Sequence, residues 1–409
     1  MELTARLDQL KEAELAPVVR KVLGDDQAWP LSWNFEALDW KAVNPATAGL
    51  FTVTGTAQTS ANREVPWIAV LKVVADIDLT GSPLDNDYIH QPQDWNYWKR
   101  EALAFRSGLL TGWPGPLVPV RCYHVEEISE GQAWIWLQAR DSAGPHAPWT
   151  VEQPGPAAYD LGALGAQWQS RLLSIEHYPW LARRWLRGWV RSIRAYAVDH
   201  FIEHECGNGS PLESLLPKTT RQRVADLISD ADDLLAAFES LPHTLAHQDP
   251  QLSNLFAATP DEFPARTVAI DWGMVGIAPI GADLGLHIEE NISSWSIDQR
   301  RAAEHDRAST AAYLKGLEDF GWDGDTDSVK FARAVAAALN GGTWLASEVA
   351  ALCPDIADRF DPDEAAWPAK VAAKQGISTA AALERWAAGL GYLLDLADEA
   401  RQLQSRLQL

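Results

Sequence analysis

The sequence predicts an α+β protein of two lobes, a small β-rich lobe followed by a larger helical one. Runs of apolar and alternating residues that indicate strands are concentrated before residue 139. From residue 161 onward, apolar residues recur mostly with the spacing of helices. The stretch between these regions is rich in glycine and proline, which is typical of a connection. We therefore divide the 409 residues into lobes at 1–139 and 140–409.

The elements of the first lobe follow from local patterns. Residues 3–23 have the apolar spacing of one amphipathic helix, and residues 94–110 predict a second helix. Strands are predicted over 35–43, 50–56, 67–74, 117–126 and 133–138. The run over 67–74 is almost continuously apolar and contains a single lysine, Lys72.

The second lobe is predicted to be mostly helical. Helices are expected over 161–174, 180–205, 218–240, 282–295, 298–319, 328–351 and 379–407. Residues 245–271 are the exception, because they contain short strand-like pieces. A crevice between two lobes is a common place for a ligand site.

The charge balance excludes some classes of partner. The chain has 34 basic and 56 acidic residues, a net charge of −22, whereas nucleic-acid binding and attachment to anionic membranes need basic surfaces. Residues 1–24 are charged from the second residue and contain no apolar signal core. No apolar run is long enough for a membrane span. We therefore expect a cytoplasmic protein without nucleic-acid or membrane partners; its oligomeric state is not set by the sequence.

The most informative motif is H-x-D-x(4)-N, formed by His247, Asp249 and Asn254. A carboxylate at Asp249 can orient a hydroxyl group and accept its proton, and an asparagine oxygen five residues later can bind Mg²⁺. The alternative interpretation is a polar loop, because Asp-Pro is a common start of a turn.

A second motif, Ile270-Asp271-Trp272-Gly273, follows a short apolar strand. Asp271 is either a metal ligand or a residue that caps a turn. A Pro-Asp turn at 260–261 predicts a hairpin, which would bring Asn254 and Asp271 together. The two motifs combined are more specific than either alone.

Two further features precede these motifs. Lys72 lies in an apolar strand, where a buried ammonium needs a partner, and Glu101 on the next helix is a candidate. Alternatively, Lys72 extends to water from an edge strand. The turn Asn44–Gly49, including Thr47, separates two strands and is either a phosphate-binding turn or an ordinary one. There is no P-loop and no G-x-G-x-x-G motif.

Weaker candidates come from the segment after the second motif. Asp283 follows a glycine and begins a helix, so it either caps that helix or braces the Asp249 loop. We interpret four other polar residues as surface or packing groups: His243, His287, Glu289 and Glu290.

In this order, the motifs resemble those of the aminoglycoside phosphotransferase and choline kinase-like family. The resemblance covers residues 35–296 and is most specific at TLAHQDPQLSNLF and TVAIDWGMVGIAPIGADLG. It implies a bilobal protein-kinase-like fold and an ATP- and Mg²⁺-dependent transfer of phosphate to a hydroxyl of a small molecule. An aminoglycoside, a sugar or a choline-like compound would be such an acceptor.

The resemblance also implies a role for each motif residue. Asp249 would orient the acceptor hydroxyl, and Asn254 and Asp271 would hold Mg²⁺. Lys72 and Glu101 would bind the nucleotide phosphates. The remaining assignments are that Thr47 to Gly49 cover these phosphates and that His247 and Asp283 support the catalytic loop.

Two alternatives to this function stay open. A protein kinase would use the same phosphate-binding residues, but no A-P-E sequence and no clear activation segment follow Gly273. A catalytically silent nucleotide-binding protein would not need the full set of Lys72, Asp249, Asn254 and Asp271. ATP and GTP cannot be distinguished at this level.

Overall fold

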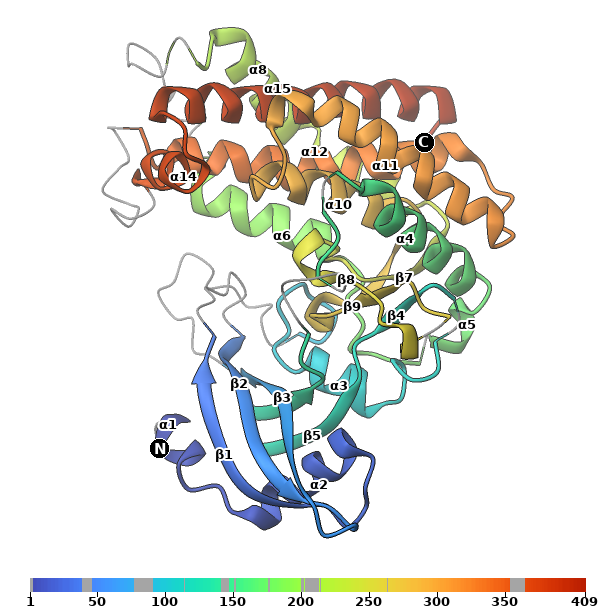
Figure 1. Cartoon of the computed structure of the whole chain (residues 1–409). Helices are drawn as coiled ribbons and strands as arrows, with labels where there is room; N and C mark the ends of the chain where they lie inside the picture. Colours follow the sequence, from blue (N-terminus) through green and yellow to red (C-terminus); the bar gives the residue numbers. More distant parts are fainter. Residues whose placement is uncertain are drawn as a thin grey trace.

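The computed structural model of the protein describes residues 3–38, 46–76, 91–113, 115–140, 147–150, 152–175, 177–199, 202, 213, 215–262, 264–353 and 365–409. Its architecture is the predicted one, with a β-sheet in the N-terminal part and helices in the C-terminal part (Figure 1). No helix in these ranges is long and apolar enough to cross a bilayer.

The N-terminal lobe is built on one antiparallel sheet of five strands in the order β1-β2-β3-β6-β5. The strands are β1 (Trp29–Ala37), β2 (Thr47–Gln58), β3 (Glu64–Ala75), β5 (Cys122–Ser129) and β6 (Gln132–Leu137). The first strand begins earlier than the predicted range of 35–43, most of which lies outside the described residues. Lys72 lies on β3, the central strand, opposite Leu50 of β2 and Ile135 of β6.

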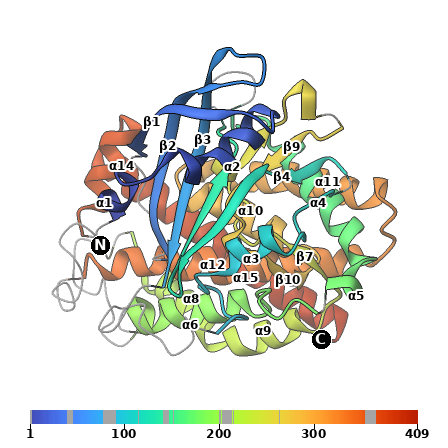
Figure 2. The same ribbon diagram turned by 90° about the horizontal axis from the view of Figure 1, so that it is seen from below.

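The predicted helix over 3–23 is two helices, α1 (Leu3–Leu7) and α2 (Glu12–Leu23). Lys11 is the N-cap residue of the second helix: its backbone is extended, and the Glu14 carboxylate accepts a hydrogen bond from the Lys11 amide at 2.9 Å. The buried face of α2, including Leu15 and Val19, packs in the same apolar cluster as Leu71 of β3. This packing covers one face of the sheet (Figure 2).

Helix α3 (Arg100–Arg106) is much shorter than the predicted 94–110. The chain before it does not form helical hydrogen bonds, because the Arg100 side chain takes the carbonyl oxygens of Pro92, Asp94 and Trp95. After it, Gly108 adopts a left-handed conformation with φ 81°. The helix is therefore limited to seven residues, of which Glu101 is the second.

Two small sheets connect the lobes. One contains β4 (Leu117–Pro119), β8 (Leu255–Ala257) and β9 (Thr267–Ala269), and the other pairs β7 (His243–Ala246) with β10 (Gly276–Pro279). The single strand predicted over 117–126 is wrong, because its first part pairs in parallel with β9 and its second part joins the large sheet. The predicted hairpin is present, with Leu255 opposite Ala269.

The C-terminal lobe is a helical assembly around α12. Its helices are α4 (Pro154–Gln169), α5 (Leu172–Ile175), α6 (Trp185–Ile193), a π-helix (Arg194–Val198), α8 (Lys218–Ser229), α9 (Ala231–Glu239), α10 (Ala282–Ser293), α11 (Ala302–Asp319), α12 (Thr326–Ala350), α14 (Trp367–Gln375) and α15 (Thr379–Leu407). Short 3₁₀ turns lie at Leu252–Asn254, Pro260–Glu262, Trp272–Met274 and Gln299–Arg301.

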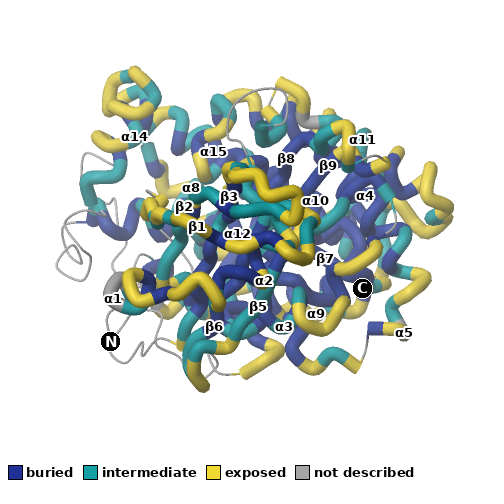
Figure 3. The backbone as a smooth tube through the Cα atoms, turned by 60° about the horizontal axis from the view of Figure 1, so that its bottom comes forward, coloured by how far each residue is buried: buried dark blue, intermediate teal, exposed yellow. Residues whose placement is uncertain are grey.

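Helix α12 is buried along most of its length and packs against α6, α10 and α15. Residues deep in the middle of the molecule are buried, whereas exposed residues lie at the rim and on the N-terminal lobe that faces the viewer (Figure 3). Helix α10 is also almost fully buried, and it runs from the small sheets into the helical core. It thereby connects the loops that follow β7 and β9 to the rigid part of the lobe.

Candidate active site

A buried ion-pair network joins the two lobes at Lys72. Its ammonium lies 2.7 Å from Glu101 Oε2 and 2.6 Å from Asp271 Oδ1, and only 5% of Lys72 is exposed. Burial alone would lower the pKa of Lys72, but the two carboxylates outweigh it, so that the pKa is raised. The lysine therefore does not extend to water, and it remains a cation inside the protein.

Glu101 holds more than the lysine. Its Oε1 atom accepts a hydrogen bond from the Trp272 amide at 3.2 Å, directly after Asp271. The Trp272 ring is fully buried, and its Nε1 donates to the Ala269 carbonyl at 3.0 Å. Asp271 itself has a left-handed backbone with φ 56°. Burial opposes ionisation of Asp271, but the neighbouring Lys72 lowers its pKa overall.

The loop after β7 is tied to the end of β9 by His247. Its Nε2 lies 2.9 Å from the Ile270 carbonyl, which can only accept, so the proton is on Nε2. The other ring nitrogen, Nδ1, accepts a hydrogen bond from the Asp249 amide at 3.3 Å. Complete burial lowers the pKa of His247 to about 4, which keeps the ring neutral.

Asp249 and Asn254 contact each other directly. The Asn254 side-chain nitrogen donates to both the backbone oxygen and Oδ2 of Asp249, each at 3.0 Å. Gln251 Nε2 donates to the other carboxylate oxygen, Oδ1, at 3.1 Å. Burial raises the pKa of Asp249 well above its ordinary value, and the nearby acids Glu290 and Asp271 raise it further. The carboxylate is thus fixed in orientation and made more basic.

The hairpin brings the Asn254 and Asp271 segments side by side. The Ile270 amide donates to the Asn254 carbonyl at 2.9 Å, immediately before Asp271. Both side-chain hydrogen bonds of Asn254 use its nitrogen, so its side-chain oxygen is available to a cation. A carboxylate and an amide oxygen are ligands that suit Mg²⁺. Among the described residues, no group of three or more His, Cys, Asp or Glu could hold a metal by itself.

Asp283 braces the loop rather than capping its own helix. Its carboxylate accepts hydrogen bonds from the backbone amides of His247 at 2.8 Å and Gln248 at 2.9 Å, whereas Gly281 is the N-cap residue of α10. Burial raises the pKa of Asp283 to about 6, although both amides oppose this effect. Of the two interpretations of Asp283, the structure favours the bracing role.

Thr47 and Gly49 are strand residues. The sequence placed them in a turn, but β2 already begins at Thr47, because Thr47 pairs with Val74 and Gly49 with Val73. The turn interpretation of these two residues is therefore wrong. Asn44 and the proline after it lie outside the described residues. A phosphate-covering role of Thr47 and Gly49 remains a prediction.

Arg100 is a residue that sequence reasoning missed. It is completely buried, and its guanidinium donates hydrogen bonds to five carbonyl oxygens, those of Pro92, Asp94, Trp95, Trp180 and Gly273. Arg100 thereby connects α3 with the Asp271-Trp272-Gly273 segment. The only signal for Arg100 in the sequence is its position beside Glu101. The sequence pattern alone would equally allow Glu101 to lie on a solvated helix face.

Two adjacent acids on α10, Glu289 and Glu290, have different surroundings. Glu289 is buried and accepts hydrogen bonds from Asn340 and, at 3.0 Å, from Ser293. The charge of Glu290 acts on Asp249, and burial raises the pKa of Glu290 to about 7. Glu289 is thus a packing group as interpreted, whereas the surface-or-packing interpretation of Glu290 misses its proximity to Asp249.

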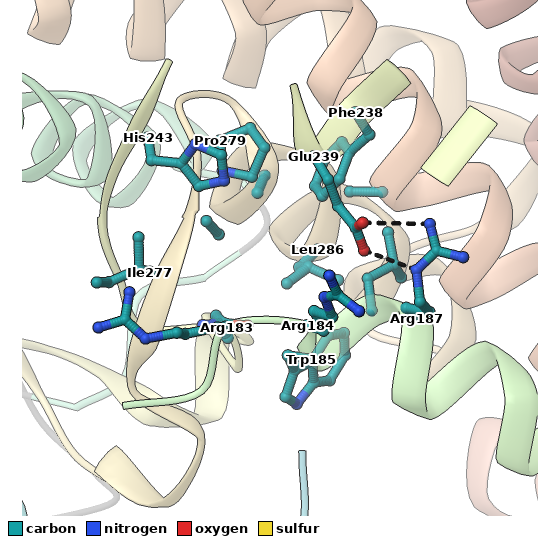
Figure 4. A pocket seen from close by; sticks show the side chains of 15 residues that line it. Arg183, Arg184, Trp185, Arg187, Phe238, Glu239, His243, Ile277, Pro279 and Leu286 are labelled. Atoms are coloured by element: carbon teal, nitrogen blue, oxygen red, sulfur yellow. Dashed lines mark hydrogen bonds and ion pairs between the residues drawn. The ribbon is translucent and has the colours of Figure 1, made fainter. Parts of the chain in front are cut away.

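Behind the loop that follows β7, a small pocket lies between β7, β10 and the starts of α6 and α10 (Figure 4). Gln248 forms part of its wall, and the Arg187–Glu239 ion pair lies at one side, with Nε to Oε1 at 2.8 Å. Its volume is about 20 Å³, which is room for one water molecule. This pocket is too small for a nucleotide or an acceptor molecule.

No protein-family model matches the chain, and no curated protein matches it. Some solved structures have a similar overall fold. An amicoumacin kinase, hAmiN, in complex with AMP-PNP, Ca²⁺ and Ami has a TM-score of 0.46 and 12% identity, over 92% of this chain and 97% of that chain.

Two further solved structures are similar over most of the chain. The microcompartment-associated aminopropanol kinase has a TM-score of 0.48 and 14% identity, over 93% of this chain and 95% of that chain. A choline kinase from Cryptosporidium parvum has a TM-score of 0.43 and 14% identity, over 85% and 92%. Each of these three proteins is named as a kinase of a small molecule.

Proposed function

We propose that this protein is a phosphotransferase that uses Mg²⁺ and ATP to phosphorylate a hydroxyl group of a small molecule. One observation carries the proposal. The cation Lys72 is held by Glu101 and Asp271, and the hairpin that ends just before Asp271 begins directly after Asn254, whose side chain holds Asp249. Phosphoryl transfer needs this combination of positive charge for the phosphates and a carboxylate for the attacking hydroxyl.

The lysine and the hairpin would bind the nucleotide. Lys72 keeps its charge in a buried place and can exchange its contact with Asp271 for the phosphate oxygens. Asp271 and the side-chain oxygen of Asn254 would hold Mg²⁺, which when bound offsets the negative charge of the phosphates. Glu101 would keep Lys72 in place during this exchange, because it also fixes the Trp272 amide.

Asp249 would orient the acceptor hydroxyl and take its proton. Hydrogen bonds from Asn254 and Gln251 reach both carboxylate oxygens and fix their direction. A raised pKa makes this carboxylate a better proton acceptor near neutral pH. Most of the rate enhancement would come from such positioning and from charge compensation.

The acceptor is proposed to carry a positive charge. Glu290 acts electrostatically on Asp249, and burial raises the pKa of Glu290 to about 7, so Glu290 and Asp249 can place negative charge next to the reacting position near neutral pH. A cationic amine on the acceptor would be attracted to these acids. Substitution Glu290→Gln should then raise KM for amino alcohols and leave KM for neutral polyols unchanged. Equal changes for both groups of compounds would contradict a cationic acceptor.

The direct test is ADP formation from Mg-ATP across a panel of hydroxylated small molecules. We expect acceptor-dependent ADP release by the wild type and almost none by the Asp249→Asn variant, with both proteins binding Mg-ATP. The exposed Asp261 provides a control, since Asp261→Asn should keep full activity. Wild-type turnover in Asp249→Asn would refute the role of Asp249. Binding of Mg-ATP without turnover on any acceptor would favour a silent nucleotide-binding protein, and phosphorylation of peptides alone would favour a protein kinase.

A further inference from the structure

One face of α10 carries three polar side chains toward the catalytic loop. Asp283, His287 and Glu290 are separated by four and three residues, which places them on the same side of a helix. Asp283 contacts the loop before Asp249, and Glu290 influences Asp249 through its charge. His287 lies between them, and the proposed reaction gives it no role so far.

His287 is completely buried and hydrogen-bonded to the catalytic loop. Its Nδ1 lies 2.8 Å from the carbonyl oxygen of Pro250, the residue directly after Asp249. A carbonyl oxygen accepts only, so Nδ1 carries the proton in this contact. Burial lowers the pKa of His287, and the ring is therefore neutral at physiological pH. The sequence interpretation of His287 as a surface or packing group thus leaves out a specific hydrogen bond.

Asp283 and His287 hold Asp249 from its two sides. Asp283 binds the amides of His247 and Gln248, which precede Asp249, and His287 binds the carbonyl that follows it. The two side chains are one helical turn apart, about 6 Å along the axis. Helix α10 therefore holds the loop on both sides of Asp249, which fixes the direction of the Asp249 carboxylate relative to this helix.

The far side of His287 is packed so that the ring keeps its position. His305 of α11 lies next to it, with ring centroids 5.9 Å apart. Asn291 donates to the His287 backbone carbonyl at 2.7 Å and also contacts His305 Nε2 at 3.3 Å. The ring is thus held between helices α10 and α11 while its Nδ1 faces the loop.

We propose that His287 is a positioning residue for phosphoryl transfer, which holds the Pro250 carbonyl so that Asp249 points at the acceptor hydroxyl. This inference rests on the proposed function. A packing residue would affect mainly the amount of folded protein. A positioning residue would affect kcat in the folded protein, because a displacement of about 1 Å at a reacting group costs about 100-fold in rate.

The test compares two substitutions at one position. Asparagine keeps an N–H donor close to the place of Nδ1, whereas leucine has a similar volume and no donor. We expect His287→Leu to lower kcat by up to about 100-fold with little change in KM for ATP. His287→Asn should restore most of this loss. If the leucine variant does not fold, His287→Gln replaces it, because its longer side chain places the amide near Nε2, away from Pro250.

The outcomes separate this inference from the proposed function. A wild-type kcat in folded His287→Leu would overturn the positioning role. An equal loss of kcat in His287→Asn and in His287→Leu, or in its replacement His287→Gln, would also overturn it. A higher KM for ATP at unchanged kcat would overturn it as well. A wild-type protein without phosphotransfer would instead refute the proposed function, on which the positioning role depends.

Discussion

Replacing Arg100 by lysine should destabilise the protein by an amount that follows from its hydrogen bonds. The guanidinium donates to five different carbonyl oxygens in a completely buried place. A lysine ammonium has three donors, so at least two of these carbonyls lose their partner. Each buried polar group without a partner costs about 1–3 kcal/mol. We therefore expect Arg100→Lys to lower the free energy of unfolding by about 2–6 kcal/mol.

Urea unfolding measures this difference, and the same helix supplies the control. Arg106 of α3 is largely exposed and pairs with the exposed Glu127, so Arg106→Lys should change the free energy of unfolding by less than about 1 kcal/mol. Arg100→Lys should also weaken Mg-ATP binding, because Arg100 fixes the Gly273 carbonyl next to Asp271. Equal stabilities of the two variants would show that the Arg100 hydrogen bonds do not support the fold.

Three further changes have clear expected outcomes. Lys72→Met should lower the free energy of unfolding by about 3–5 kcal/mol, since it leaves the buried Glu101 and the Asp271 carboxylate without their cation; a thermal or urea transition like that of the wild type would contradict this. Asp271→Ala should make nucleotide affinity independent of Mg²⁺, and a calorimetric titration with and without the metal would reveal any remaining dependence. Burial lowers the pKa of His305 from 6.5 to about 3, so its contribution to stability is present above pH 6.5 and is lost as the pH falls. His305 alone should cost the wild type about 2 kcal/mol between pH 7 and pH 5, and His305→Asn should not show this part of the loss.

The lobes and the main motifs were predictable from the sequence because their signals are local. The lysine in an apolar strand indicates that a partner is needed, and the Pro-Asp turn predicts the hairpin that joins Asn254 to Asp271. The bilobal α+β architecture also followed from the change of periodicity between the two parts of the chain. In each case a few neighbouring residues decide the structure.

Most errors come from strand pairing and side-chain contacts that a pattern of apolar residues does not contain. Residues 117–126 have one continuous strand pattern, but β9 pairs with the first part and β6 with the second, so the strand divides between two sheets. The helical period of 94–110 is overridden at its start by Arg100, whose side chain takes the carbonyls that a longer helix would use. Helix α14 was not predicted, since it is short and has few apolar residues in a regular pattern.

Two residues of the site have strained backbone conformations, and buried side chains of the same site hold them there. Gln248 and Asp271 have left-handed conformations, with φ 64° and φ 56°, which cost non-glycine residues about 1–3 kcal/mol each. The Gln248 amide is held by Asp283, and the Asp271 carboxylate is held by Lys72. These contacts keep the two turns in conformations that the local sequence disfavours. Because the turns set the directions of Asp249 and Asp271, the orientation of both carboxylates is fixed before any substrate binds.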